Sequence, residues 1–120
     1  MVTVTAFAHA NLVVEDVAAA RRFYGELLGL EEIHRPEGAG RDGVWYRIGA
    51  VELHISYEAN PANARSTRHV ALEVADLAAA RQALEQAGHP IEAARPLPGI
   101  ERFFTRDPDG NRVELMRRLT

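Results

Sequence analysis

Two segments of the chain, one in each half, carry a histidine and a glutamate at matching places. Residues 9–21 align with residues 69–81 at an offset of 60; each segment begins with a histidine, and eight of the thirteen positions are identical. Further along, Glu52 aligns with Glu114 at an offset of 62, because both lie in the tripeptide Val-Glu-Leu. Imidazole and carboxylate groups bind transition-metal ions and transfer protons, so a site built from both halves could do either kind of chemistry.

Along the predicted strands, these His and Glu residues alternate with apolar residues. Side chains two positions apart share a strand face, and the immediate neighbours of His9 and Glu114 are apolar. We expect the apolar face to pack on a helix and the His and Glu side chains to lie on the opposite face. If the sheets of both halves join into a cup, the predicted metal ligands converge there; they are His9, Glu52, His69 and Glu114.

This ligand set predicts one divalent metal ion (Ni, Zn, Mn, Fe or Co) with positions open to a small-molecule substrate. The ion would polarise a substrate oxygen and stabilise negative charge on it. Glu52 and Glu114 are the predicted catalytic residues, because a carboxylate beside the substrate can move a proton. His54 shares a strand face with Glu52 and is an open alternative to it as fourth ligand. The repeat favours Glu52, because His54 aligns with Met116 at the same offset.

The two halves also share one order of predicted elements: a strand, a helix and three strands. Asp16 and Asp76 precede the helices as N-caps, and a glycine follows each helix. The first half predicts a strand over 3–14, a helix over 17–28 and strands over 30–35, 43–48 and 50–57. The second predicts a strand over 67–74, a helix ending at Ala87 and strands over 91–96, 100–106 and 111–118. Trp45, Tyr46, Phe103 and Phe104 are expected in the core.

The predicted fold class is therefore α+β. Two tandem βαβββ modules, about 1–58 and 66–120 of a single domain over 1–120, would form a cupped mixed β-sheet with the helices on its outer face. Such a duplication has too few copies for a solenoid, which needs three or more repeats.

The composition narrows the function classes. With 120 residues, 47% hydrophobic and 26% charged, the chain has the size and balance of one globular domain. The absence of Cys excludes disulfides and thiolate sites. The net charge of −3 and the scattered arginines argue against nucleic-acid binding. The sequence has neither an apolar run of membrane-spanning length nor a signal peptide, so we expect no membrane partner and a cytoplasmic location.

Four stretches resemble the vicinal oxygen chelate superfamily, which includes glyoxalase I, extradiol dioxygenases and bleomycin-binding proteins. They are residues 9–16 (HANLVVED), 22–30 (RFYGELLGL), 68–72 (RHVAL) and 107–115 (DPDGNRVEL). The resemblance implies that His9, His69 and Glu114 match shared metal-ligand positions and that Glu52 matches an additional glutamate of glyoxalase I-like members. In that group a metal holds two adjacent substrate oxygens, and a glutamate shuttles a proton through an enediolate.

Two functions of different classes are compatible with these residues. The first is a metal-dependent enzyme that acts through an enolate or oxyanion, as a lyase, isomerase, transferase or dioxygenase. The second is a metal-free protein that binds a small molecule or antibiotic, like the bleomycin-binding relatives. Two His and two Glu facing inward favour the enzyme, because such a cluster without a cation would carry unpaired charge. Relatives are commonly homodimers, so a homodimer is expected, with the modules paired within one chain or across two.

Overall fold

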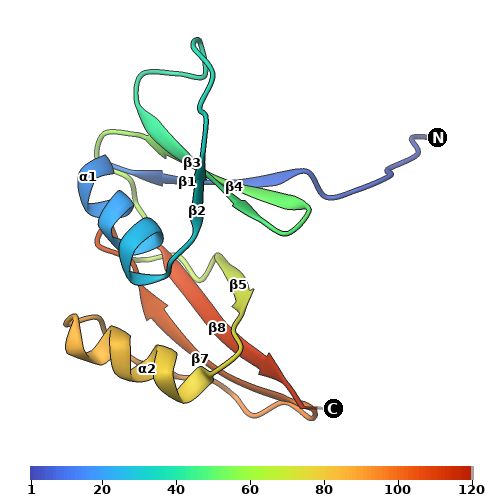
Figure 1. Ribbon diagram of the computed structural model, residues 1–120, viewed down its shortest axis with the longest axis vertical. Helices are drawn as coiled ribbons and strands as arrows, with labels where there is room; N and C mark the ends of the chain where they lie inside the picture. Colours follow the sequence, from blue (N-terminus) through green and yellow to red (C-terminus); the bar gives the residue numbers. More distant parts are fainter. Residues whose placement is uncertain (120) are drawn as a thin grey trace. The chain divides into compact units, whose positions relative to one another are not determined.

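The computed structural model describes residues 1–119 (Figure 1). The chain divides into two compact units, Met1–Ala59 and Asn60–Thr120, which we call module 1 and module 2. In the described part of the chain, no helix has the length and apolar character needed to cross a membrane.

Module 1 is a four-stranded mixed sheet with one helical segment. Its central strand β4 pairs in parallel with β1 and antiparallel with β3, giving the order β1-β4-β3-β2. In chain order the elements are β1 (His9–Val14), α1 (Val17–Ala20), its wider π-type continuation η1 (Arg21–Leu27), β2 (Glu31–Ile33), β3 (Gly43–Ile48) and β4 (Val51–Tyr57).

Module 2 repeats this plan. Its central strand β8 pairs in parallel with β5 and antiparallel with β7, giving the order β5-β8-β7-β6. The elements are β5 (His69–Glu73), α2 (Leu77–Gln86), β6 (Glu92–Ala93), β7 (Ile100–Arg106) and β8 (Arg112–Arg118). The α+β prediction of two βαβββ modules, each with a mixed sheet and a helix, is confirmed.

Each helix begins at the predicted aspartate. The Asp16 carboxylate accepts a hydrogen bond from Ala19 N at 2.9 Å, and Asp76 accepts one from Ala79 N at 3.0 Å. These bonds satisfy a backbone donor that the first helical turn leaves unpaired. The same hydrogen bond from a backbone N–H to an aspartate side chain therefore sets the start of both helices.

The apolar faces of the sheets are buried as expected. In module 1 the fully buried side chains include Val14, Tyr24, Tyr46 and Ile55; in module 2 they include Leu84, Val113 and Leu115. On β8, Val113 and Leu115 alternate with Glu114. Because neighbours on a strand point to opposite faces, this packing turns Glu114 to the other side of the sheet.

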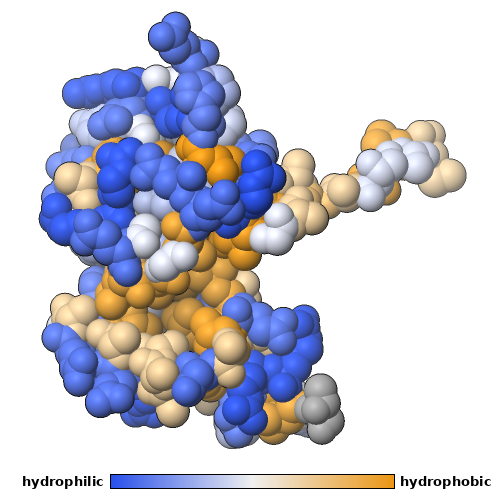
Figure 2. All heavy atoms as spheres, in the orientation of Figure 1, coloured by the Kyte–Doolittle hydropathy of each residue, from blue (hydrophilic) through white to orange (hydrophobic). Residues whose placement is uncertain are grey.

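The first strand is shorter than predicted. Residues 3–8 have the Val, Thr and Phe content of a strand, but β1 begins only at His9. Its parallel partner β4 begins at Val51, directly after the turn that joins it to β3, so no strand is available to pair with earlier residues. Val2, Val4 and Phe7 are exposed, and Figure 2 shows this N-terminal segment as a mostly apolar extension. Strand propensity without a partner strand is insufficient to form a ladder.

Tyr46 is buried beneath the helical segment of module 1. A Cβ atom on Gly25 would lie 3.2 Å from the Tyr46 hydroxyl, so the close approach of η1 to β3 depends on this glycine. Within the described residues 1–119, the hydroxyl has no hydrogen-bond partner. Burial raises the pKa of Tyr46, and the nearby Glu32 carboxylate raises it further. Glu32 also forms a hydrogen bond with Arg21 Nε at 3.1 Å, which raises the pKa of Arg21.

Candidate functional site

Three rings from adjacent strands stack in module 1. The His54 ring on β4 lies 3.6 Å from the Trp45 ring of β3 and 4.0 Å from the His9 ring of β1, measured between centroids. The interplanar angles are 3° and 17°. Trp45 is the direct cross-strand partner of His54, so strand pairing builds this contact. The stack holds the His54 ring in one orientation.

Glu52 extends this cluster through a hydrogen bond. His54 Nε2 lies 2.9 Å from Glu52 Oε1, and because a carboxylate only accepts, Nε2–H is the donor. The His54 side chain is 9% exposed and the Glu52 side chain 33%. A carboxylate that accepts from one ring nitrogen orients the ring and leaves its other nitrogen as an electron-pair donor, which is the usual arrangement of a metal-binding histidine.

In module 2, His69 faces a hydrogen-bond acceptor at each ring nitrogen. Nδ1 lies 3.0 Å from the carbonyl oxygen of Thr67, and Nε2 lies 3.2 Å from Glu114 Oε1. Neither oxygen can donate, and a neutral imidazole has only one N–H. When Nδ1–H donates to Thr67, a lone pair of Nε2 faces the Glu114 carboxylate, so this contact requires either a second proton on the ring or a cation between the two groups.

Arg102 supplies positive charge to the same oxygen of Glu114. Its Nη1 lies 3.3 Å from Glu114 Oε1, and its Nη2 donates to the carbonyl oxygen of Arg95 at 3.0 Å. The side chains of Arg102 and Glu114 are 16% and 9% exposed. Glu114 is thus a buried carboxylate whose Oε1 contacts both a guanidinium and an imidazole. The ring of Phe104, which lies 5.0 Å from the His69 ring, closes the cluster.

The strand registers relate the two modules differently from the sequence alignment. His9 of β1 pairs with Glu52 of β4, and His69 of β5 pairs with Arg112 of β8, each partner lying 43 residues later. Since His9 and His69 are 60 residues apart, the same offset makes Glu52 equivalent to Arg112 and His54 equivalent to Glu114. Burial agrees, because His54 and Glu114 are each 7% exposed when backbone and side chain are taken together.

The alignment of Glu52 with Glu114 is therefore wrong as a structural correspondence, although the Val-Glu-Leu tripeptides are identical. The ladder partner lies 43 residues after the first-strand histidine in both modules, but Glu52 lies 43 residues after His9 and Glu114 lies 45 residues after His69, so the identical tripeptides occupy different ladder positions. An alignment anchored on strand pairing would have identified His54 as the residue equivalent to Glu114.

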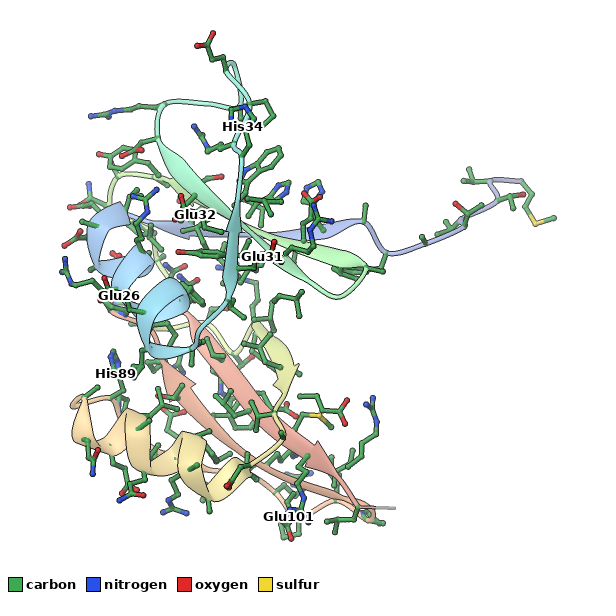
Figure 3. The ribbon with its side chains drawn as sticks, viewed as in Figure 1. Glu26, Glu31, Glu32, His34, His89 and Glu101 are labelled. Carbon is green, nitrogen blue, oxygen red and sulfur yellow. The ribbon has the colours of Figure 1, made fainter. Side chains whose placement is uncertain are left out.

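The predicted ligands thus form one cluster in each module. His9 stacks on His54, which binds Glu52; His69 contacts Glu114. Within residues 1–119 the structure contains no group of three or more His, Asp or Glu side chains arranged to hold a metal ion. The remaining histidines lie elsewhere: His34 is exposed, and His89 Nδ1 donates to the carbonyl of Arg106 at 3.1 Å (Figure 3).

The sequence prediction placed some residues of these two clusters in the core and gave others no role. Tyr46, Phe103 and Phe104 are buried as predicted, but Trp45 is half-buried and stacks on His54. The two-residue turn between Ile48 and Val51 sets the pairing of Trp45 with His54, so a hairpin signal at Gly49 would have revealed the contact.

Comparisons with known proteins agree with this architecture. A protein from Bacillus anthracis described as a glyoxalase family protein is 32% identical, with 98% of each chain covered and a TM-score of 0.85. A lactoylglutathione lyase from Agrobacterium tumefaciens is 26% identical over 96% of this chain and 95% of that chain, with a TM-score of 0.73. An antibiotic-binding protein from Streptomyces sp. CB03234 is 17% identical over 98% and 99% of the two chains, with a TM-score of 0.79, which shows the shared fold alone.

The curated proteins give no match to this chain. Residues 6–115 match the family described as the Glyoxalase/Bleomycin resistance protein/Dioxygenase superfamily. This range contains all four predicted ligands and every strand and helix of the two modules except the last three residues of β8. The chain belongs to the Glyoxalase/Bleomycin resistance protein/Dioxygenase superfamily.

Proposed function

We propose that this protein is an enzyme that uses a divalent metal ion, one of Ni, Zn, Mn, Fe or Co, to act on a small oxygenated substrate. The proposed ligands are His9 and His54 from module 1 and His69 and Glu114 from module 2. Glu52, the fourth ligand expected from sequence alignment, is assigned instead to orienting His54 and moving a proton. The proposal requires the two pairs to meet, within one chain or between two copies of the chain.

One observation carries this proposal. His69 Nε2 lies 3.2 Å from Glu114 Oε1 and Nδ1 lies 3.0 Å from the Thr67 carbonyl oxygen, so a neutral ring presents a lone pair to one of these two oxygens. A divalent cation suits this pair, since an imidazole nitrogen and a carboxylate oxygen are both donors to ions of borderline hardness. The buried Arg102 beside Glu114 fits an orienting role, because groups that hydrogen-bond to a ligating carboxylate fix its position.

The bound ion would supply Lewis-acid stabilisation of negative charge on a substrate oxygen. The residues of the chain do the rest. His54 is held by the Trp45 stack and by Glu52, so its ring is oriented before substrate arrives. Glu52 is the more exposed carboxylate of the two clusters, which makes it the one able to take a proton from a substrate carbon or oxygen.

Metal content tests the proposal. Protein purified without a histidine tag and stripped with chelator would be incubated with Ni, Mn, Fe, Co or Zn salts, desalted and analysed for bound metal. We expect about one ion per site in the wild type and almost none in His69→Ala or Glu114→Ala. His34→Ala, which removes an exposed histidine, is the matched control. Equal metal content in wild type and both site variants would refute the proposal.

The same experiment separates His54 from Glu52. If His54 is a ligand, His54→Ala loses the metal, whereas Glu52→Ala retains it with about 10- to 100-fold lower affinity, as expected for an orienting partner. Loss of metal in Glu52→Ala with full retention in His54→Ala would reverse the assignment.

A metal-free binding protein is the second candidate, and Arg102 is the observation that favours it. Its guanidinium already places a positive charge 3.3 Å from Glu114, so the carboxylate is compensated without an ion. This function predicts a protein that takes up no metal from any of the five salts and is stabilised against thermal unfolding by a small-molecule ligand.

A further inference from the structure

A pocket of about 400 Å³ lies beside His69 on the sheet of module 2. The tips of β5 and β8, the strand β7 and the segment after β6 contribute to it. Three of its lining side chains are arginines, namely Arg95, Arg102 and Arg112, and none is acidic. Such a concentration of guanidinium groups stands out in a chain whose net charge is −3.

Nearby carboxylates offset only part of this charge. Arg102 is paired with Glu114, and Arg112 Nε lies 3.8 Å from Glu92, which also pairs with Arg106 at 3.4 Å. Four guanidinium groups therefore share two carboxylates. The Arg95 side chain lies in the pocket lining and is exposed. The pocket keeps a net positive charge.

Among residues 1–119, two guanidinium nitrogens of the pocket residues have no acceptor at hydrogen-bond distance. Nε of Arg102 and Nε of Arg112 are both buried and lack a hydrogen-bond partner, although the other two nitrogens of Arg102 are engaged by Glu114 and Arg95. Both Nε atoms are covered by protein, so a ligand in the pocket would meet the other N–H groups of these side chains, whose positive charge carboxylates offset only in part. Such a ligand must be anionic or strongly polar to match two guanidinium groups.

Phe104 fixes the orientation of these guanidinium groups. The Arg112 guanidinium carbon lies 3.5 Å from the Phe104 ring centroid and that of Arg102 lies 5.4 Å from it. Cation–π contacts of this kind hold a guanidinium at a set position over the ring. Because the same ring also contacts His69, the donors are placed next to the proposed metal ligand.

The two modules differ in charge at this place. The register makes Arg112 equivalent to Glu52 of module 1, so the same ladder position carries a negatively charged side chain in module 1 and a positively charged one in module 2. The two clusters thus have different tasks: module 1 offers a carboxylate for proton transfer, whereas module 2 offers donors for an anion.

We infer that the pocket binds the carboxylate group of an organic-acid substrate through the guanidinium groups that line it, those of Arg95, Arg102 and Arg112. Planar guanidinium groups match carboxylate geometry, and a pocket of about 400 Å³ holds a small molecule. The inference rests on the proposed function in one respect, because the substrate it describes is the one acted on beside His69.

Side-chain NMR of metal-free, ¹⁵N-labelled protein tests the inference. Sodium pyruvate and sodium benzoate are the carboxylate probes, and inorganic phosphate is the alternative anion. We expect the Nε–H signals of Arg102 and Arg112 to shift in a saturable way with both carboxylates, while the signal of the exposed Arg117 stays in place. Arg112→Gln and Arg95→Gln should each weaken binding about tenfold, the effect of losing one charge-assisted interaction. Arg117→Gln, on the same strand as Arg112 but outside the pocket, should bind as the wild type does.

Shifts that do not saturate, or that persist unchanged in Arg112→Gln and Arg95→Gln, would overturn the inference. Saturable binding of phosphate without binding of either carboxylate would overturn the assignment to organic acids. Arg95 is exposed, so its variant keeps the test valid if Arg112→Gln folds poorly. Because the titration uses metal-free protein, carboxylate binding together with failed metal uptake would leave the pocket assignment standing and remove the metal-dependent function.

Discussion

Replacing the Glu114 carboxylate by an amide tests the charge arrangement of module 2. Glu114→Gln keeps the size of a side chain that is 9% exposed, but removes the negative charge beside His69 and Arg102. Arg102, only 16% exposed, would then be a buried cation with no carboxylate partner. Breaking a buried ion pair by removing one partner costs about 3–5 kcal/mol. Since Arg102 is close to the surface and keeps its bond to the Arg95 carbonyl, we expect the lower end, about 3 kcal/mol.

The assay is urea or thermal unfolding in the presence of chelator, followed by circular dichroism. For a chain of this size, about 3 kcal/mol corresponds to a fall in Tm of about 10 °C. A double-mutant cycle with Arg102→Met isolates the pair, and we expect a coupling energy of about 1–3 kcal/mol. Arg117→Met on the same sheet is the control and should show no coupling to Glu114. A loss below about 0.5 kcal/mol in Glu114→Gln, the range of ordinary surface substitutions, would refute the reasoning.

Three further predictions follow from other features. Trp45 is the single tryptophan and stacks on His54 at 3.6 Å, so Ni²⁺ bound at His54 should quench its fluorescence in the wild type but not in His54→Ala. Tyr46→Phe should be neutral or stabilising by about 1 kcal/mol, because it removes a buried hydroxyl without a partner. The pKa of Tyr46 is raised in the folded protein, so its contribution to wild-type stability should be fully present below the usual tyrosine pKa of about 10 and be lost as pH rises toward the folded value. Thermal unfolding across that pH range should therefore show a smaller loss of stability in Tyr46→Phe than in the wild type. The sequence leads us to expect a homodimer, and Val2, Val4 and Phe7 are exposed apolar residues that a second copy would cover. Deleting residues 1–7 should therefore raise the dimer dissociation constant measured by light scattering and leave monomer unfolding unchanged; an unchanged dimer would show that this segment is not part of the dimer contact.

The repeat in the sequence was sufficient to predict the fold class. Strand boundaries were accurate where a turn or a cap defines them, as for 43–48 and 100–106. The first strand was predicted too long, because propensity is local whereas a ladder needs a partner that begins at Val51. The helix of module 1 also departs from the expected form: it widens after Ala20, in the turns that hold Phe23 and Tyr24 in the core.

The candidate site could be predicted only in part, because it too depends on how the strands pair. Alternation alone places His54 and Glu52 on one face, and the structure joins them by a hydrogen bond. Which of them corresponds to Glu114 depends on strand register, and a two-residue shift is invisible in an alignment of identical tripeptides. Arg102 could be proposed from the sequence as a contact for an anionic substrate, but a surface position is the commoner one for an arginine, and Arg112 gave no signal. Their unsatisfied Nε atoms can be recognised only once the surrounding side chains are placed.

The spacing of the parallel partners affects how the protein folds. Within each module the first strand pairs with a strand 43 residues later, whereas β3–β4 and β7–β8 are neighbours in sequence. Closing the long loop costs more chain entropy than forming the hairpins, so the outer parallel strand should dock late in the folding reaction. That strand carries His9 in one module and His69 in the other. A folding intermediate with only its hairpins formed would therefore lack His9 and His69, two of the four proposed ligands, and metal uptake should follow the slowest folding phase.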